Sequence, residues 1–175
     1  MAEATLGPPR GASPLNRAEA ARLIALLLPI ALLGGAYAFQ YLGGLYPCEM
    51  CWWQRYPHAA AILLAAFAFT VPAASKRART LTLLAALAIA ISGLIGVYHA
   101  GVELKIFEGF TTCTSTVKAA STQELLKQLM AVPLIRCDQV QWSLFGVSLA
   151  GWNAIFSLGG SAAIAWLALS GRRAS

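Results

Sequence analysis

Four long stretches without a formal charge constrain this chain more than any other feature of its sequence. They cover residues 23–48, 56–75, 80–102 and 139–171. A helix of about 20 apolar residues crosses the hydrocarbon core of a bilayer. Only 11% of the residues are charged and 58% are hydrophobic, whereas roughly 25% are charged in an ordinary soluble domain. The sequence therefore predicts an all-α integral membrane protein, a bundle of four transmembrane helices, and it excludes a soluble or disordered chain.

The expected organisation is one membrane domain over residues 20–171, between a flexible cytoplasmic tail (1–19) and a short C-terminus (172–175). The four helices are expected at about residues 22–45, 56–75, 80–99 and 144–170, with outer loops at about 46–55 and 100–143. A signal peptide cleaved after residues 36–38 is the alternative to the first helix. The apolar run continues through Leu45, which favours a spanning helix.

The basic residues predict the orientation of these helices. Eight of the thirteen Lys and Arg residues fall in residues 1–22, in the segment 76–79 and at the C-terminus, which share one side if the helices alternate. The positive-inside rule makes that side cytoplasmic. Both termini are then cytoplasmic and all four cysteines lie outside, where disulfides persist in a bacterial periplasm. The net charge of +6 is explained by topology, so no nucleic-acid partner is expected.

The second outer loop contains a short amphipathic pattern. Ser121 and Glu124 are three residues apart, as in a capping box, and an apolar stripe follows them before Pro133. The pattern predicts a short amphipathic helix. Such a helix would lie on the membrane surface or pack on the bundle, and the sequence does not favour either arrangement.

One short segment carries the residues best suited to chemistry. Cys48 and Cys51 are three apart, so they can close a disulfide at the start of a helix, where backbone N–H groups favour a thiolate. Arg55 lies four residues after Cys51 and can stabilise its thiolate or an anionic ligand. An arginine that reaches toward the interface is the alternative. Trp52 and Trp53 fit either a ligand wall or an interfacial aromatic belt.

The two remaining cysteines, Cys113 and Cys137, lie far from this pair in the sequence. Four cysteines allow three pairings, and the sequence alone does not choose among them. A zinc site is not expected, because no second CxxC and no paired histidines accompany the first pair. A c-type haem is excluded at the motif because Trp52, and not histidine, follows Cys51.

The run from residue 48 to residue 55, CEMCWWQR, resembles the CxxCxxQR signature of DsbB-type disulfide bond formation proteins. The resemblance covers about residues 20–170 and the four-helix layout. It extends to the run YHAGVE at residues 98–103 and to positions near the fourth helix, namely Cys137, Asp138, Trp142, Gly146, Ser148, Trp152 and Asn153. The related vitamin K epoxide reductases place their CxxC late in the chain, and the order of cysteines argues against them.

The resemblance implies a quinone-linked thiol oxidase of the bacterial inner membrane. In that reading, Cys113–Cys137 is the disulfide that accepts electrons from a periplasmic thioredoxin-like partner of the DsbA type, with the mixed disulfide on Cys113. Cys137 passes the electrons to Cys48–Cys51 by thiol–disulfide exchange. Cys51 then faces ubiquinone or menaquinone from the membrane pool, with Arg55 near the quinone oxygen.

His99 lies at the outer end of the third helix, where the resemblance implies quinone contact and a helix-end cap is the alternative. Glu103, one turn later, is expected to be solvated. A different class of function is a non-enzymatic membrane scaffold with two structural disulfides. A transporter is disfavoured because these helices are expected to carry almost no polar groups inside the bilayer.

Overall fold

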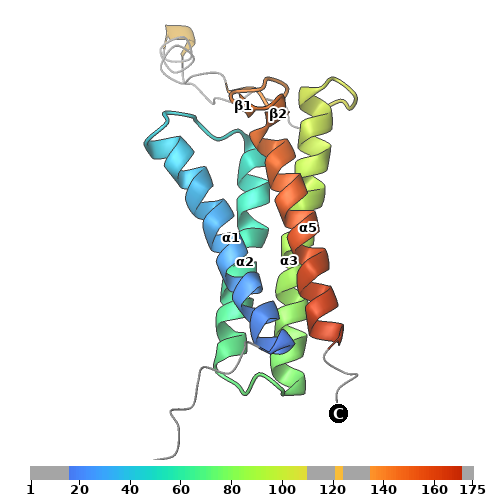
Figure 1. Cartoon of the computed structure of the whole chain (residues 1–175). Helices are drawn as coiled ribbons and strands as arrows, with labels where there is room; N and C mark the ends of the chain where they lie inside the picture. The colour runs from blue at the N-terminus through green and yellow to red at the C-terminus, as the bar shows by residue number, and fades with distance from the viewer. Residues whose placement is uncertain (1–15, 110–120, 124–134, 171–175) are drawn as a thin grey trace, which may run out of the picture.

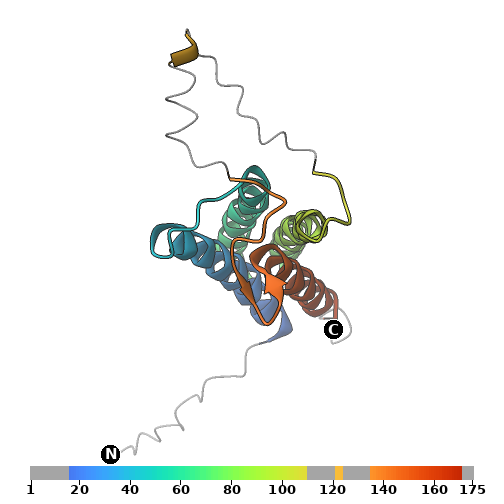
Figure 2. The same cartoon turned by 90° about the horizontal axis from the view of Figure 1, so that it is seen from above.

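Four helices in a ring form the body of the protein (Figure 1). The computed structural model describes residues 16–109, 121–123 and 135–170. The helices are α1 (Arg17–Tyr41), α2 (Glu49–Phe69), α3 (Lys76–Glu103) and α5 (Leu149–Ser170). Seen end-on, α1 neighbours α2 and α5, and α3 lies beside the same two helices on the opposite side (Figure 2). Cys113, residues 1–15 and 171–175, and the predicted amphipathic helix beyond residue 123 lie outside the described residues.

The helix ends differ from the sequence prediction because caps, and not charges, set them. A charged side chain does not interrupt backbone hydrogen bonding, so α2 begins at Glu49 instead of near residue 56. The side chains of Asn16, Cys48 and Ser75 accept hydrogen bonds from the backbone N–H groups that open α1, α2 and α3. The segment predicted as an outer loop, 46–55, is therefore largely the first two turns of α2. The other helices also shift: α1 begins and ends earlier than 22–45, and α3 extends beyond 80–99 at both ends.

A small hairpin precedes the last helix. Helix α5 therefore begins at Leu149 and not, as the sequence predicts, at residue 144. Strands β1 (Ser143–Leu144) and β2 (Val147–Ser148) pair antiparallel. Phe145 and Gly146 join them with φ values of 52° and 77°, as a two-residue turn with both residues at positive φ requires. Apart from these strands the described residues are helical or irregular.

Three of the four helices, α1, α3 and α5, are long and apolar enough to cross a membrane. Helix α2 has spanning length, but Gln54, Arg55 and His58 make its first half polar. All three side chains are buried inside the bundle. The prediction of four spanning helices is thus confirmed for three of them by length and composition. The polar side chains of α2 are buried against the other helices.

Small residues dominate the core at the end where α1 begins and α5 ends. Alanines from all four helices, including Ala25, Ala65, Ala85 and Ala168, pack there around Ile89 and Ile164. Small side chains let helix backbones approach closely, which is a common basis for helix association in membranes. At the other end the interior is polar, and the cysteines of the CxxC motif lie there.

Candidate functional site

The CxxC pair lies at the first turn of α2. Cys48 is the N-cap, and its sulfur accepts a hydrogen bond from the backbone N–H of Cys51 at 3.4 Å. The two Sγ atoms, drawn as thiols, are 2.9 Å apart. Cys48 is buried and Cys51 is half-buried. The prediction that the pair lies at the start of a helix is confirmed, and Cys51 is the more exposed of the two residues.

Cys137 belongs to the same cluster although 86 or more residues separate it from the motif in the chain. It is buried beside Cys48, Met50 and Val102. A hydrogen bond with Cys137 raises the pKa of the Cys48 thiol, and the hydrogen bond with Cys51 and burial raise it further. Cys48 therefore lies between two other sulfurs, in surroundings that disfavour its thiolate. Cys113, which the resemblance pairs with Cys137, lies outside the described residues.

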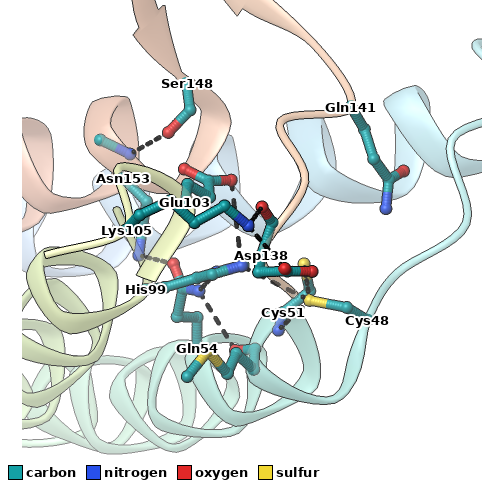
Figure 3. A network of polar contacts seen from close by, with 12 residues as sticks. Cys48, Cys51, Gln54, His99, Glu103, Lys105, Asp138, Gln141, Ser148 and Asn153 are labelled. Atoms are coloured by element: carbon teal, nitrogen blue, oxygen red, sulfur yellow. Dashed lines mark hydrogen bonds and ion pairs between the residues drawn. The ribbon is translucent and has the colours of Figure 1, made fainter. Parts of the chain in front are cut away.

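His99 on α3 connects the cysteines to the interior of the bundle (Figure 3). Its Nε2 lies 3.6 Å from Cys48 Sγ, and its Nδ1 lies 2.9 Å from Gln54 Nε2. Gln54 Nε2 also donates to Met50 O at 3.1 Å, which identifies that atom as the amide nitrogen. His99 Nδ1 must therefore accept, so a neutral His99 carries its proton on Nε2, directed at the Cys48 sulfur.

Glu103 is not solvated as the sequence predicts. Its side chain is only 8% exposed, and Oε1 lies 3.9 Å from His99 Nε2, one turn earlier on α3. The carboxylate therefore forms part of the buried surroundings of His99. No pattern in the sequence indicates this burial, which depends on neighbours distant in the chain such as Ser148.

Arg55 is buried against α1. Its Nη1 donates to Gln40 Oε1, and its Nη2 donates to Ala36 O at 3.2 Å. The guanidinium lies 4.7 Å from the ring centroid of Tyr37 and 4.9 Å from that of Trp52. These contacts fix its position, which differs from that of an interfacial arginine extending into the headgroup region.

A polar network that sequence analysis missed extends from Gln54 into the bundle. Asn153 Nδ2 on α5 donates to Gln54 Oε1 at 2.8 Å. Asn153 Oδ1 lies 2.9 Å from His58 Nε2 on α2 and accepts from Ser157 at 3.0 Å. Ser92 on α3 donates to Gln54 O at 2.8 Å. The expectation that the helices carry almost no interior polar groups is therefore wrong.

These groups line a cavity of about 390 Å³. One wall is the small-residue face of α1, which includes Gly35 and Ala36, and the aromatic side chains of Phe39, Trp142 and Trp152 contribute to other walls. The polar and sulfur-bearing groups that border the cavity include Cys48, Cys51, Gln54, Arg55, His58, His99 and Asn153, together with Glu103, Arg136, Gln139 and Gln141. A mainly apolar hollow with a few convergent polar groups is typical of a site for a small, largely apolar molecule.

The cysteine cluster also has the donors that a soft metal ion prefers. Ligand atoms of Cys48, Cys51 and His99 all lie within 4.8 Å of one another. Thiolates and imidazole bind zinc, but a disulfide does not offer thiolate ligands. Metal binding would therefore require the reduced pair and would compete with dithiol chemistry.

The loop that carries Cys137 is fixed to the end of α3 by charge. Asp138 forms ion pairs with Lys105 and with Arg136, and Lys105 Nζ also donates to Asp138 O at 2.8 Å. The Arg136 guanidinium, and then the Lys105 ammonium, hold the pKa of the Asp138 carboxyl well below its usual range. These contacts help to keep Cys137 beside Cys48.

Comparison with known proteins agrees with this architecture. The family model for disulfide bond formation protein DsbB matches residues 18–167. Disulfide bond formation protein B 1 of Pseudomonas putida is 37% identical, with 82% of this chain and 85% of the relative covered. Disulfide bond formation protein B of Shewanella amazonensis is 31% identical, with coverage of 83% and 85%. The protein of that name in Chromohalobacter salexigens is 28% identical, with coverage of 76% and 80%.

No solved structure gives a significant match to the chain. The match of the family model spans all four helices and includes the CxxC segment, His99 and Cys137. The two relatives above 30% identity cover most of both chains. The chain is a membrane protein of the DsbB family of disulfide bond formation proteins.

Proposed function

We propose that the protein is a thiol oxidase of the bacterial inner membrane that forms disulfide bonds de novo. It reoxidises a periplasmic thioredoxin-like protein of the DsbA type and delivers the electrons to ubiquinone or menaquinone. The observation that carries this proposal is the position of Cys51, which borders a mainly apolar cavity while its partner Cys48 contacts Cys137. Both termini would be cytoplasmic and the cysteines periplasmic.

The arrangement of sulfurs supports a direction for the exchange. Attack of a Cys137 thiolate on Cys48 would form a Cys48–Cys137 disulfide and release Cys51 as a thiolate. The His99 N–H directed at Cys48 would stabilise charge that develops on that sulfur during exchange. That Cys137 thiolate would arise when a thiolate of the partner attacks Cys113 of the Cys113–Cys137 disulfide and forms a mixed disulfide on Cys113. The partner's second thiol would then release Cys113, whose thiolate would attack Cys137 and leave Cys48 and Cys51 as a reduced pair for the quinone to oxidise. Each full cycle would remove two electrons and two protons from the partner's dithiol.

The residues around the cavity fit a quinone. Its apolar and aromatic walls suit a flat ring, and Arg55 is a fixed cation at one side. A bound quinone supplies an acceptor for two electrons and two protons. Arg55, Gln54 and His99 would hold the ring, and Arg55 would stabilise negative charge that develops near Cys51.

A non-enzymatic scaffold is the less favoured function. Structural disulfides require no cavity beside the sulfurs and no buried cation four residues from one of them. In the described residues, Cys51 has both: it borders the cavity and lies one helical turn from Arg55. The cavity and the cation therefore favour an enzyme.

Turnover of purified protein tests the proposal. We expect a reduced thioredoxin-like substrate and a short-chain quinone to be consumed in equal amounts, as thiol loss and quinone absorbance report. Cys51→Ala should abolish quinone reduction. Trp53→Phe alters the adjacent residue, which does not line the cavity, and should retain it. Quinone reduction that is absent from the wild type, or that survives Cys51→Ala, would contradict the proposal.

A further inference from the structure

His58 has one nitrogen without a hydrogen-bond partner in an otherwise satisfied network. The residue is 3% exposed, and its Nδ1 has no partner among the described residues. Nε2, in contrast, lies 2.9 Å from both Asn153 Oδ1 and Ser92 Oγ. A buried polar atom without a partner costs free energy, so such atoms are uncommon in folded proteins. His58 also borders the cavity.

The neighbours of His58 determine where its proton lies. Asn153 Nδ2 donates to Ser92 O at 3.3 Å and to Gln54 Oε1, so the other amide atom, Oδ1, is the acceptor that faces His58. The Ser92 hydroxyl already donates to Gln54 O. Neither neighbour can then donate to Nε2, so Nε2 carries the hydrogen. In a neutral imidazole the second nitrogen, Nδ1, is then a hydrogen-bond acceptor.

This acceptor differs in chemistry from Arg55, which borders the same cavity. Arg55 offers only donors and contacts α1, whereas His58 offers an acceptor and contacts α3 and α5. The two oxygen atoms of a para-quinone lie at opposite ends of its ring. As carbonyls they accept hydrogen bonds, and in the reduced form they are hydroxyls that also donate. A donor-only group suits either form, but an acceptor needs the hydroxyl.

We infer that His58 is a ligand-binding residue that accepts a hydrogen bond from a hydroxyl of the reduced ligand, a quinol. The inference rests on the proposed function and extends it to selectivity between redox forms. A binding site favours the quinol over the quinone only if its affinity for the two redox forms differs. By binding the product more tightly than the oxidised form, His58 would favour electron transfer out of the cysteines and slow release of the product.

Two substitutions separate the acceptor from the network. His58→Gln places an amide nitrogen near the position of Nε2, so it retains the hydrogen bond to Asn153 and loses the acceptor at Nδ1. His58→Asn places an amide oxygen near Nδ1, so it retains the acceptor and loses the bond to Asn153. Ser157→Ala removes a hydrogen bond from the same network and leaves His58 intact, and is the control.

Equilibrium binding of a short-chain ubiquinone to the oxidised protein, and of the matching quinol to the reduced protein, measures the effect without electron transfer. We expect His58→Gln to raise the Kd for quinol about fivefold, as loss of one neutral hydrogen bond does, and to leave the Kd for quinone within about twofold. His58→Asn should lower the melting temperature and retain quinol affinity. Ser157→Ala should change neither Kd.

The outcomes distinguish this inference from the proposed function. Equal weakening of quinone and quinol by His58→Gln, or no weakening of quinol, would overturn the role of His58 while the wild type still binds both forms. A wild-type protein that binds neither form and reduces no quinone would overturn the proposed function, and the role of His58 with it.

Discussion

Two buried arginines hold the antiparallel helices α1 and α2 together, one at each end. Arg22 on α1 donates to Ala68 O and Val71 O at the end of α2. Arg55 on α2 donates to Ala36 O near the end of α1. Their exposed fractions are 9% and 7%, and each places a cation near the negative end of the partner helix dipole.

The surroundings of the two arginines differ. Arg22 contacts backbone carbonyls and the ring of Phe69, beside a core of alanines. Arg55 borders the cavity that also contains Cys51. The same contact between helices is therefore structural at one end, and at the other end it also supplies a fixed charge to a site. Burial alone does not distinguish a structural arginine from a candidate binding residue. The adjoining cavity distinguishes Arg55 from Arg22.

Replacing Arg55 with Met gives the largest effect that this comparison predicts. Loss of one preorganised donor at a site of developing charge lowers kcat by about 100-fold, and we expect that loss in quinone reduction. Thiol–disulfide exchange between the protein and its partner should keep its rate, because Arg55 contacts α1 and borders the cavity beside Cys51, whereas the partner exchanges with Cys113–Cys137 in the proposed cycle. Stopped-flow measurement of each half-reaction checks this. Equal loss of both rates would contradict the assigned role.

Replacing Arg22 with Met is the matched change at the opposite end. Two hydrogen bonds from a charged donor are lost, and we expect the free energy of unfolding to fall by about 2 kcal/mol. Turnover per folded molecule should be unchanged, since Arg22 does not border the cavity. Denaturant titration in detergent, with activity measured on the folded fraction, tests both points. A specific loss of turnover without loss of stability would remove the contrast with Arg55.

A substitution that fills the cavity and leaves both arginines in place tests whether the cavity is the ligand site beside Arg55. A Cβ added at Gly34 or at Gly35 meets no heavy atom within 4 Å, but only Gly35 borders the cavity. Gly35→Leu should raise KM for quinone about tenfold, because small changes in pocket volume have effects of that size. Gly34→Leu, with the same change in helix propensity, should stay near the wild-type value. Similar KM values for the two variants would show that the ligand binds elsewhere.

The smallest effect is expected for an ion pair in solvent. Asp138 is exposed relative to the arginines, and surface pairs contribute little. Its pKa is lowered in the folded protein, so its stabilising effect is present above the unfolded pKa of about 4 and declines as the pH falls further. The melting temperature of Asp138→Asn should lie about 1 °C below that of the wild type at neutral pH. The difference should shrink below about pH 4, and a difference that grows on acidification would contradict this.

The sequence predicted the part of the site that is local in the chain. Cys48, Cys51 and Arg55 lie within eight positions of one another, so their spacing predicts a common site, although the predicted loop at 46–55 missed the helix that carries them. The membrane class followed from the charge-free stretches. The helix ends could not be read from charge, because the side chain of a cysteine and two other polar residues cap the helices.

The polar network depends on contacts between helices, which one sequence does not specify. A signal was nevertheless present. Polar residues recur at one-turn or two-turn spacing on three helices: Gln54 and His58, Ser92 and His99, Asn153 and Ser157. Such pairs share a helix face, and a polar face on an apolar helix predicts an interior contact in a membrane protein. Glu103 gave no comparable signal, since the residues that cover it come from a distant segment.

The segment that leads into the hairpin before α5 connects Cys137 with the residues that line the cavity. The ring of Trp142 packs at a tilt against that of Phe39 of α1, with 4.9 Å between ring centroids, and Leu144 and Phe145 border the cavity. Cys137 is only five positions before Trp142, so under the proposed function a partner protein that draws Cys137 outward would also displace residues that line the cavity. Thermodynamic linkage then makes the effect reciprocal: the factor by which docking at Cys137 changes ligand affinity equals the factor by which the ligand changes docking.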